Sequence, residues 1–139
     1  MSVSLIGTES GWRVTEPRYL LDSNICIYIL DGRGEALRAR LETEPPGALV
    51  ASAISFAEVM RGIAPQDTAG EAGARRLFAA VPVLPFDAAA ARAYRTLPFK
   101  RARFDRLIAA HALALDLTLV TNDTTDFVDI PGLKLENWT

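Results

Sequence analysis

The stretch that decides the fold is RYLLDSNICIYIL, residues 18–30, in which Asp22 is the only charged residue after Arg18. Residues 19–21 predict a short buried strand and residues 23–30 predict a helix, so Asp22 lies at the turn between them. An unpaired carboxylate buried there would cost several kcal/mol. Asp22 is therefore expected to cap the helix, to pair with another group, or to help hold a cation.

The same alternation of short apolar runs and helical patterns continues to the C-terminus and predicts α/β architecture. We expect a three-layer α/β/α domain over residues 18–139, with a central, mostly parallel sheet of about five strands, preceded by an arm at residues 1–17. The expected strands are 19–21, 49–51, 81–84, 117–120 and 133–136. The expected helices are 23–30, 34–42, 53–63, 70–80, 88–95 and 103–115.

Composition excludes several classes of protein. The chain has 139 residues, 50% of them hydrophobic, which is an ordinary size for one domain. Its formal net charge of −2 does not fit a generally basic protein that coats nucleic acid. Cys26 is the single cysteine, so no disulfide framework is expected and a reducing cytoplasm is the simplest location. Membrane association is not expected, because charged residues interrupt every apolar run.

Three further acids lie close to apolar segments, and each also has an ordinary explanation. Glu58 is the only ionisable residue between positions 45 and 60, and it could be a solvated helix residue paired with Arg61. Asp105, near the start of the last helix, could serve only the helix dipole. Asp123 follows the fourth strand in LTLVTNDTTDF, residues 117–127, where turn residues are common. For Asp22 the ordinary explanation is the helix N-cap.

Topology favours a common role for these acids. Ligands of open parallel sheets bind beyond the carboxyl ends of the strands. Asp22 and Asp123 follow two such ends, and the helices carrying Glu58 and Asp105 could lean over the same edge. Clustered carboxylates repel one another unless a cation lies between them. Oxygen ligands without cysteine or histidine favour Mg²⁺ or Mn²⁺.

Five blocks of the chain, in this order, resemble PIN-domain ribonucleases, specifically the VapC-type toxins of bacterial toxin–antitoxin pairs. They are YLLDSNICIYIL, ISFAEVMRGI, PFDAAAARAY, FDRLIAAHALALDLTLVTNDTTDF and IPGLKLENW. The resemblance spans nearly everything after the arm. It implies hydrolysis of RNA phosphodiester bonds with Mg²⁺ or Mn²⁺, self-association as a homodimer, and capture by a VapB-like antitoxin whose C-terminal segment covers the acidic site.

By the resemblance, the catalytic and metal-binding quartet is Asp22, Glu58, Asp105 and Asp123, and Ser23 stands where relatives usually have a threonine hydroxyl. Many relatives carry Asn at the position of Asp123 and an acid three residues later. Asp126 is therefore a candidate to share or replace the fourth role. The segment before the last helix is also shorter here than in many relatives, so the wall facing RNA could differ.

Other candidates surround this quartet. Asn24 and Thr121 could support the metal ligands, although a turn residue and a strand-end hydroxyl are the simpler interpretations. RNA contact is considered for Arg61, Lys100, Arg101 and Arg103; the last three belong to a run of six bases between positions 92 and 106. His111 is expected in the core, on a buried stripe of the last helix formed by Phe104, Leu107, Ile108, His111 and Leu115.

Competing enzyme classes lack their defining residues. A haloacid-dehalogenase-type phosphatase needs a second aspartate at position 24, which is Asn24, and a phosphorelay receiver needs a lysine that neither Lys100 nor Lys134 supplies. A nucleotide cofactor is not expected, because residues 22–31 contain no glycine for a phosphate loop. Two alternatives stay open: a housekeeping RNA-processing nuclease, and a catalytically silent protein-binding module of the same fold.

Overall fold

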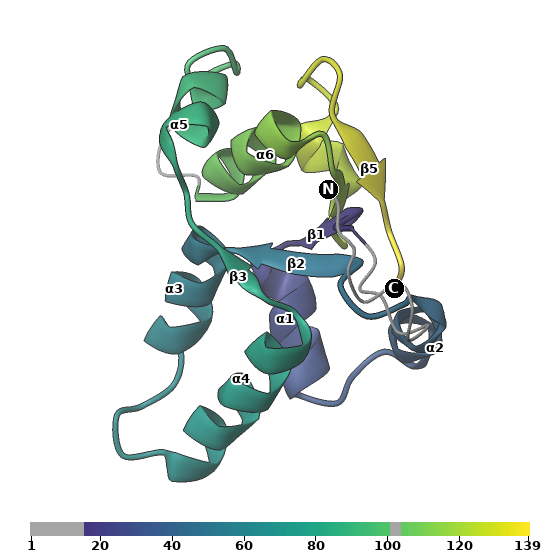
Figure 1. Cartoon of the computed structure of the whole chain (residues 1–139), viewed down its shortest axis with the longest axis vertical. Helices are drawn as coiled ribbons and strands as arrows, with labels where there is room; N and C mark the ends of the chain where they lie inside the picture. The colour runs from purple at the N-terminus through teal and green to yellow at the C-terminus, as the bar shows by residue number, and fades with distance from the viewer. Residues whose placement is uncertain (1–15, 101–103) are drawn as a thin grey trace, which may run out of the picture.

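The computed structural model describes residues 16–100 and 104–139, which form a five-stranded, all-parallel sheet flanked by helices (Figure 1). The strand order is β3-β2-β1-β4-β5, so β1 lies at the centre, between β2 and β4. The strands are β1 (Tyr19–Leu21), β2 (Leu49–Ser52), β3 (Val83–Leu84), β4 (Thr118–Val120) and β5 (Lys134–Glu136). The predicted α/β fold with a central parallel sheet is confirmed.

The side chains of the central strand alternate between two hydrophobic cores, one on each face of the sheet. Leu20 points to one face of the sheet, while Tyr19 and Leu21 point to the other. On the Leu21 face lie α1 (Ser23–Leu30), α2 (Glu35–Thr43), α3 (Ala53–Arg61) and α4 (Thr68–Ala80). On the Leu20 face lie α6 (Phe104–Leu115) and the 3-10 helix η2 (Thr124–Phe127), with α5 (Ala88–Tyr94) packed on α6. Figure 1 shows these helices as two layers on either side of the sheet.

Register places the ends of the two central strands side by side. Leu21 of β1 pairs with Val120 of β4, and the backbone N–H of Asp22 donates to the Val120 carbonyl over 3.0 Å. Asp22 and Thr121, the residues that follow these strands, therefore emerge together at the carboxyl edge. This is the point where strand order changes direction, and it is where ligands of such sheets bind.

Side-chain caps explain where several helices begin. Asp22, Ser52, Asp67 and Asp87 each accept a hydrogen bond from a backbone N–H in the first turn of α1, α3, α4 and α5. The Asp67 cap starts α4 at Thr68, two residues before the predicted start. The strand predicted from residue 81 is shorter than expected, because the Val81 N–H closes the end of α4 on Leu77.

Burial confirms part of the sequence prediction and corrects another part. Cys26 and His111 are buried in the core, as expected. The predicted stripe on α6 is wrong at both ends, since Phe104 is 59% exposed and Leu115 is 41% exposed. In the middle of the helix Ile108 and His111 are buried as predicted, and three alanines, Ala109, Ala110 and Ala112, are buried with them. Within the described residues, no helix is both long and apolar enough to cross a membrane.

Candidate active site

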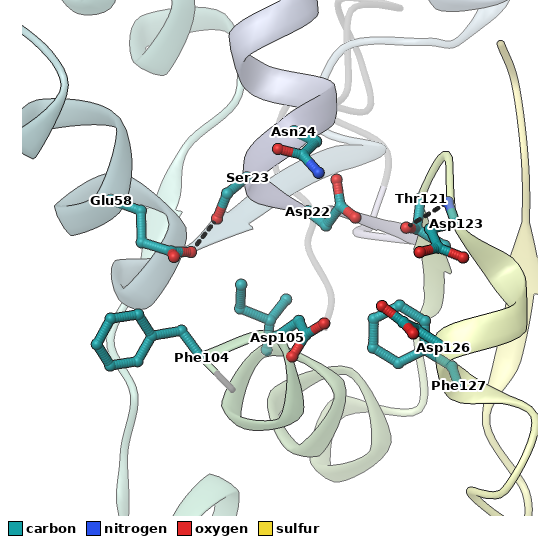
Figure 2. Close-up of a pocket in the computed structure, with 11 residues that line it drawn as sticks. Asp22, Ser23, Asn24, Glu58, Phe104, Asp105, Thr121, Asp123, Asp126 and Phe127 are labelled. Atoms are coloured by element: carbon teal, nitrogen blue, oxygen red, sulfur yellow. Dashed lines mark hydrogen bonds between the residues drawn. The ribbon is translucent and has the colours of Figure 1, made fainter. Parts of the chain in front are cut away.

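A pocket of about 260 Å³ opens at the carboxyl ends of β1 and β4. Its wall includes all the acids that the sequence singled out: Asp22, Glu58, Asp105, Asp123 and Asp126. They come from the β1–α1 turn, α3, α6 and the segment around η2, and Figure 2 shows their carboxylates arranged around one space. Ser23, Asn24 and Thr121 line the same pocket. The tertiary structure therefore brings together acids that are up to 104 positions apart in the chain.

Asp22 is both a helix cap and part of this wall. One carboxylate oxygen accepts a hydrogen bond from the Ile25 N–H over 2.9 Å, while the side chain is only 6% exposed. Burial raises the pKa of Asp22, and the negative charges of Asp105 and Glu58 raise it further. Hydrogen bonds from Thr121 and Ile25 act in the opposite direction. The capping interpretation is thus correct, and it does not exclude the functional one.

Glu58 is held by a neighbour that is remote in sequence. The hydroxyl of Ser23 donates to Oε1 of Glu58, across 35 positions of sequence, and Figure 2 shows this bond. The predicted alternative was an ion pair with Arg61. The ion pairs among residues 16–100 and 104–139 do not include a pair between Glu58 and Arg61. Ser23 therefore orients an acid from α3 toward the start of α1.

Thr121 connects the two acids that follow the strands. Its hydroxyl oxygen accepts the backbone N–H of Asp123 over 3.1 Å, and the same hydroxyl lowers the pKa of Asp22. Because the oxygen already accepts from Asp123, its own proton is available for the Asp22 carboxylate. Asp123 in turn accepts from the Thr125 hydroxyl over 2.8 Å. The exposed Asn24 lies on the rim of the pocket, beside Asp22 (Figure 2).

The donor set of the pocket fits a hard divalent cation. Five carboxylates and two hydroxyls line the wall, and none of its lining residues among positions 16–100 and 104–139 is a lysine or arginine. The pKa of Asp22 is raised first by burial and then by repulsion from Asp105 and Glu58, and a bound cation would offset that repulsion. Among residues 16–100 and 104–139, however, no three His, Cys, Asp or Glu side chains stand close enough to form a ready metal group. The chemistry of the ligands, oxygen donors only, nevertheless fits Mg²⁺ or Mn²⁺.

The basic candidates have different positions. Arg61 is exposed and lines a second, mainly apolar pocket that shares Glu58 and Phe104 with the acidic one. Lys100 is exposed. Arg101 and Arg103 lie outside the described residues.

Arg106, which the sequence places in the same basic run, is 1% exposed and is bound to Asp129 over 2.8 Å. It is therefore a buried structural residue rather than part of a surface for RNA. No local pattern in the sequence predicts this pairing, because Asp129 lies 23 positions away.

The comparisons with known proteins agree with this geometry. Residues 19–133 match the PIN domain family. The chain is 31% identical over 131 residues to Ribonuclease VapC2 of Rickettsia felis, covering 86% of this chain and 97% of that protein. It is 29% identical over 130 residues to the tRNA(fMet)-specific endonuclease VapC of Shigella flexneri, covering 87% and 98%.

Solved structures give the same result. The DNA-bound VapBC structure from Salmonella typhimurium superposes with a TM-score of 0.76 at 26% identity, covering 88% of this chain and 99% of that chain. VapBC2 from Rickettsia felis, bound to a promoter DNA fragment, gives 0.73 at 27% identity over 87% and 98%. The chain belongs to the PIN domain family and is related to the VapC toxins of VapBC toxin–antitoxin systems.

Proposed function

We propose that the protein is a Mg²⁺- or Mn²⁺-dependent endoribonuclease that acts in the cytoplasm as the toxin of a toxin–antitoxin pair. One observation carries the proposal: five carboxylates from four separate segments line one pocket at the carboxyl edge of the sheet. Its relatives are described as ribonucleases and as a tRNA-specific endonuclease. A substrate phosphate can bind beside so many carboxylates only when a metal ion offsets the negative charge between them.

In this proposal, Asp22, Glu58 and Asp105 would hold the metal, and Asp123 or Asp126 would hold a second ion or orient a water. The bound ion would lower the pKa of the attacking water and offset charge on the phosphate. The protein's own contribution is orientation. Ile25 and Thr121 fix the Asp22 carboxylate, and Ser23 fixes Glu58.

We propose that Arg61 and Lys100, both of which are exposed, contact the RNA; Arg61 lines the apolar pocket that adjoins the acidic one. Their positive charges would contact phosphates next to the cleaved one, which makes binding dependent on salt. Arg101 and Arg103 are proposed for the same role. The exposed Phe104 lies between the acidic pocket and the apolar pocket that Arg61 lines.

The toxin role rests on the relatives. One solved structure of a similar chain is a toxin–antitoxin complex from Klebsiella pneumoniae. Others are VapBC2 bound to a DNA fragment from its promoter and FitAB bound to a DNA fragment. By analogy we propose a homodimer whose acidic site is covered by a VapB-like antitoxin. A basic side chain of the antitoxin could pair with the carboxylates that the metal would otherwise hold.

The test is cleavage of a fluorescent single-stranded RNA and of mixed tRNA by purified protein, with Mn²⁺, Mg²⁺ or EDTA. Asp105→Asn should lose nearly all cleavage. Asp116→Asn is a matched control, because Asp116 has a 91% exposed side chain and lies outside the pocket. Its left-handed backbone, at φ 56°, also suits asparagine. Cleavage that persists in EDTA, or that Asp105→Asn retains in full, would overturn the proposal.

A further inference from the structure

Arg106 joins three separate segments beneath the acidic pocket. Its guanidinium Nη2 donates to the backbone carbonyl of Asp126 over 3.0 Å and to Oδ1 of Asp129 over 2.8 Å, and Nη1 lies 3.5 Å from the carbonyl of Pro98. Arg106 directly follows Asp105 in the first turn of α6. One side chain therefore connects the helix turn that carries Asp105 to the short helix η2 that carries Asp126.

We infer that Arg106 is a positioning residue that fixes Asp126 relative to Asp105 across the pocket. This inference rests on the proposed function for its catalytic meaning. The bond goes to the backbone of Asp126 itself, so it sets the position of the acid rather than of a distant neighbour. Figure 2 shows Asp105 on α6 and Asp126 on the segment around η2, and both residues line the pocket.

The segment that carries Asp126 needs such an anchor. The helix η2 has four residues, Thr124–Phe127, and its N-cap Asp123 makes no capping hydrogen bond with its side chain. A 3-10 helix of this length has few internal bonds of its own. Phe127 and Ile130 pack in the core below it, and Arg106 supplies the polar contacts on the same side.

The charge of Arg106 is balanced outside the pocket. Hydrogen bonding to Arg106 lowers the pKa of Asp129, so this carboxylate is ionised at neutral pH and pairs with the guanidinium. Asp129 does not line the acidic pocket. The contribution of Arg106 to the acids is therefore expected to be geometric. Lysine could not replace it fully, because an ammonium group lacks the planar fork that reaches several acceptors at once.

The experiment compares Arg106→Met with Asp129→Asn in the full chain. Arg106→Met keeps much of the side-chain volume and removes every hydrogen bond of the guanidinium. Asp129→Asn removes the charge of the ion pair but leaves the bond to the Asp126 carbonyl. Both variants should melt at a lower temperature. Only Arg106→Met should weaken Mn²⁺ binding, by about tenfold, as expected when an outer support of a metal ligand is lost.

A double-mutant cycle with Asp126→Asn tests whether Arg106 affects Mn²⁺ binding through Asp126. If Arg106 acts through Asp126, Asp126→Asn should weaken Mn²⁺ binding in the wild-type background and add little in the Arg106→Met background. Additive effects would overturn the inference, and so would equal Mn²⁺ affinities of Arg106→Met and Asp129→Asn. In either case a wild-type protein that binds Mn²⁺ and cleaves RNA would leave the proposed function standing.

Hydrogen exchange tests the positioning role without metal or RNA, and so applies even if the protein binds no Mn²⁺ and cleaves no RNA. The Ile130 N–H donates to the Phe127 carbonyl at the end of η2, over 3.1 Å. Its hydrogen exchange should become faster in Arg106→Met and stay close to wild type in Asp129→Asn. Unchanged exchange in Arg106→Met would overturn the inference. If the wild-type protein neither binds Mn²⁺ nor cleaves RNA, the proposed function fails and this exchange still decides the positioning role.

Discussion

Nδ1 of His111 lies 2.8 Å from the hydroxyl oxygen of Ser52, although the two residues are 59 positions apart in the chain. Ser52 caps α3 by accepting the Ile54 N–H over 3.1 Å, and His111 belongs to α6. The bond therefore joins the helix that carries Glu58 to the helix that carries Asp105. Its partners are almost fully buried, since Ser52 is 0% and His111 is 2% exposed.

Protonation of His111 should destabilise the protein in mild acid. Burial lowers the pKa of His111 below 6.5, although the negative charge of Asp87 raises this pKa in part. The folded state therefore keeps the imidazole neutral. Below pH 6.5 the unfolded chain binds this proton more readily, and the free energy of unfolding decreases as the pH is lowered.

His111→Phe should remove that part of the pH dependence. It should also lower the free energy of unfolding by about 1–3 kcal/mol at pH 7.5, because it removes the partner of a buried hydroxyl. Urea unfolding of the wild type and of His111→Phe between pH 5.5 and 7.5 measures how the free energy of unfolding of each depends on pH. A His111→Phe variant with the wild-type slope would contradict the prediction.

Asp22 should shift stability in the opposite direction. Its pKa is raised in the folded state, so without metal the folded protein binds this proton more readily and gains stability as the pH falls from neutral. Asp22→Asn keeps a capping oxygen for Ile25 and removes the charge. We expect this variant to be more stable than wild type in EDTA at pH 7.5, and less stable than wild type in millimolar Mn²⁺ because it gains little from binding.

Asp22→Ala is the matched control, because it removes both the charge and the cap and so loses about 1 kcal/mol of helix stability. The measurement is a set of melting curves at pH 5.5 and 7.5, with EDTA and with Mn²⁺. If Asp22→Asn melts below wild type in EDTA, and Mn²⁺ shifts both equally, Asp22 is a helix cap and nothing more.

Ser23 should matter for activity and little for stability. Its hydroxyl holds Glu58, and supports of this kind typically change metal affinity or activity by 10- to 100-fold. We expect Ser23→Ala to lower Mn²⁺-dependent RNA cleavage by about tenfold. Ser23→Thr keeps the hydroxyl and should retain most of the activity. Equal rates for Ser23→Ala and wild type would show that Glu58 needs no such support.

Expression of the chain alone should arrest bacterial growth if it is a toxin. The arrest should disappear in an Asp22→Asn and Asp105→Asn double variant, because two ligands of the proposed metal site are lost. Co-expression of the small protein encoded next to it should restore growth. Arrest by the double variant would show that toxicity does not come from nuclease activity. Absence of arrest by wild type, with RNA cleavage intact, would favour a housekeeping nuclease.

The sequence alone determined the order of strands and helices and the identity of the acids. Apolar runs with a period of two or a helical period mark the elements locally, and parallel pairing then follows from their alternation. The bounds of α1 agree with the prediction because the turn residue Asp22 fixes its start. It could also be predicted that Asp22 and Asp123 lie at the same edge of the sheet, since both follow strands of the same parallel sheet.

Only the tertiary structure decided which partners the side chains find. Arg106 lies in a basic run and looks solvated in sequence, yet it is buried, because Asp129 and the Asp126 carbonyl come within reach only after folding. The same holds for Ser23 with Glu58. Local sequence encodes periodicity and propensity, whereas hydrogen bonds across 20 to 59 positions depend on how the helices pack on the sheet.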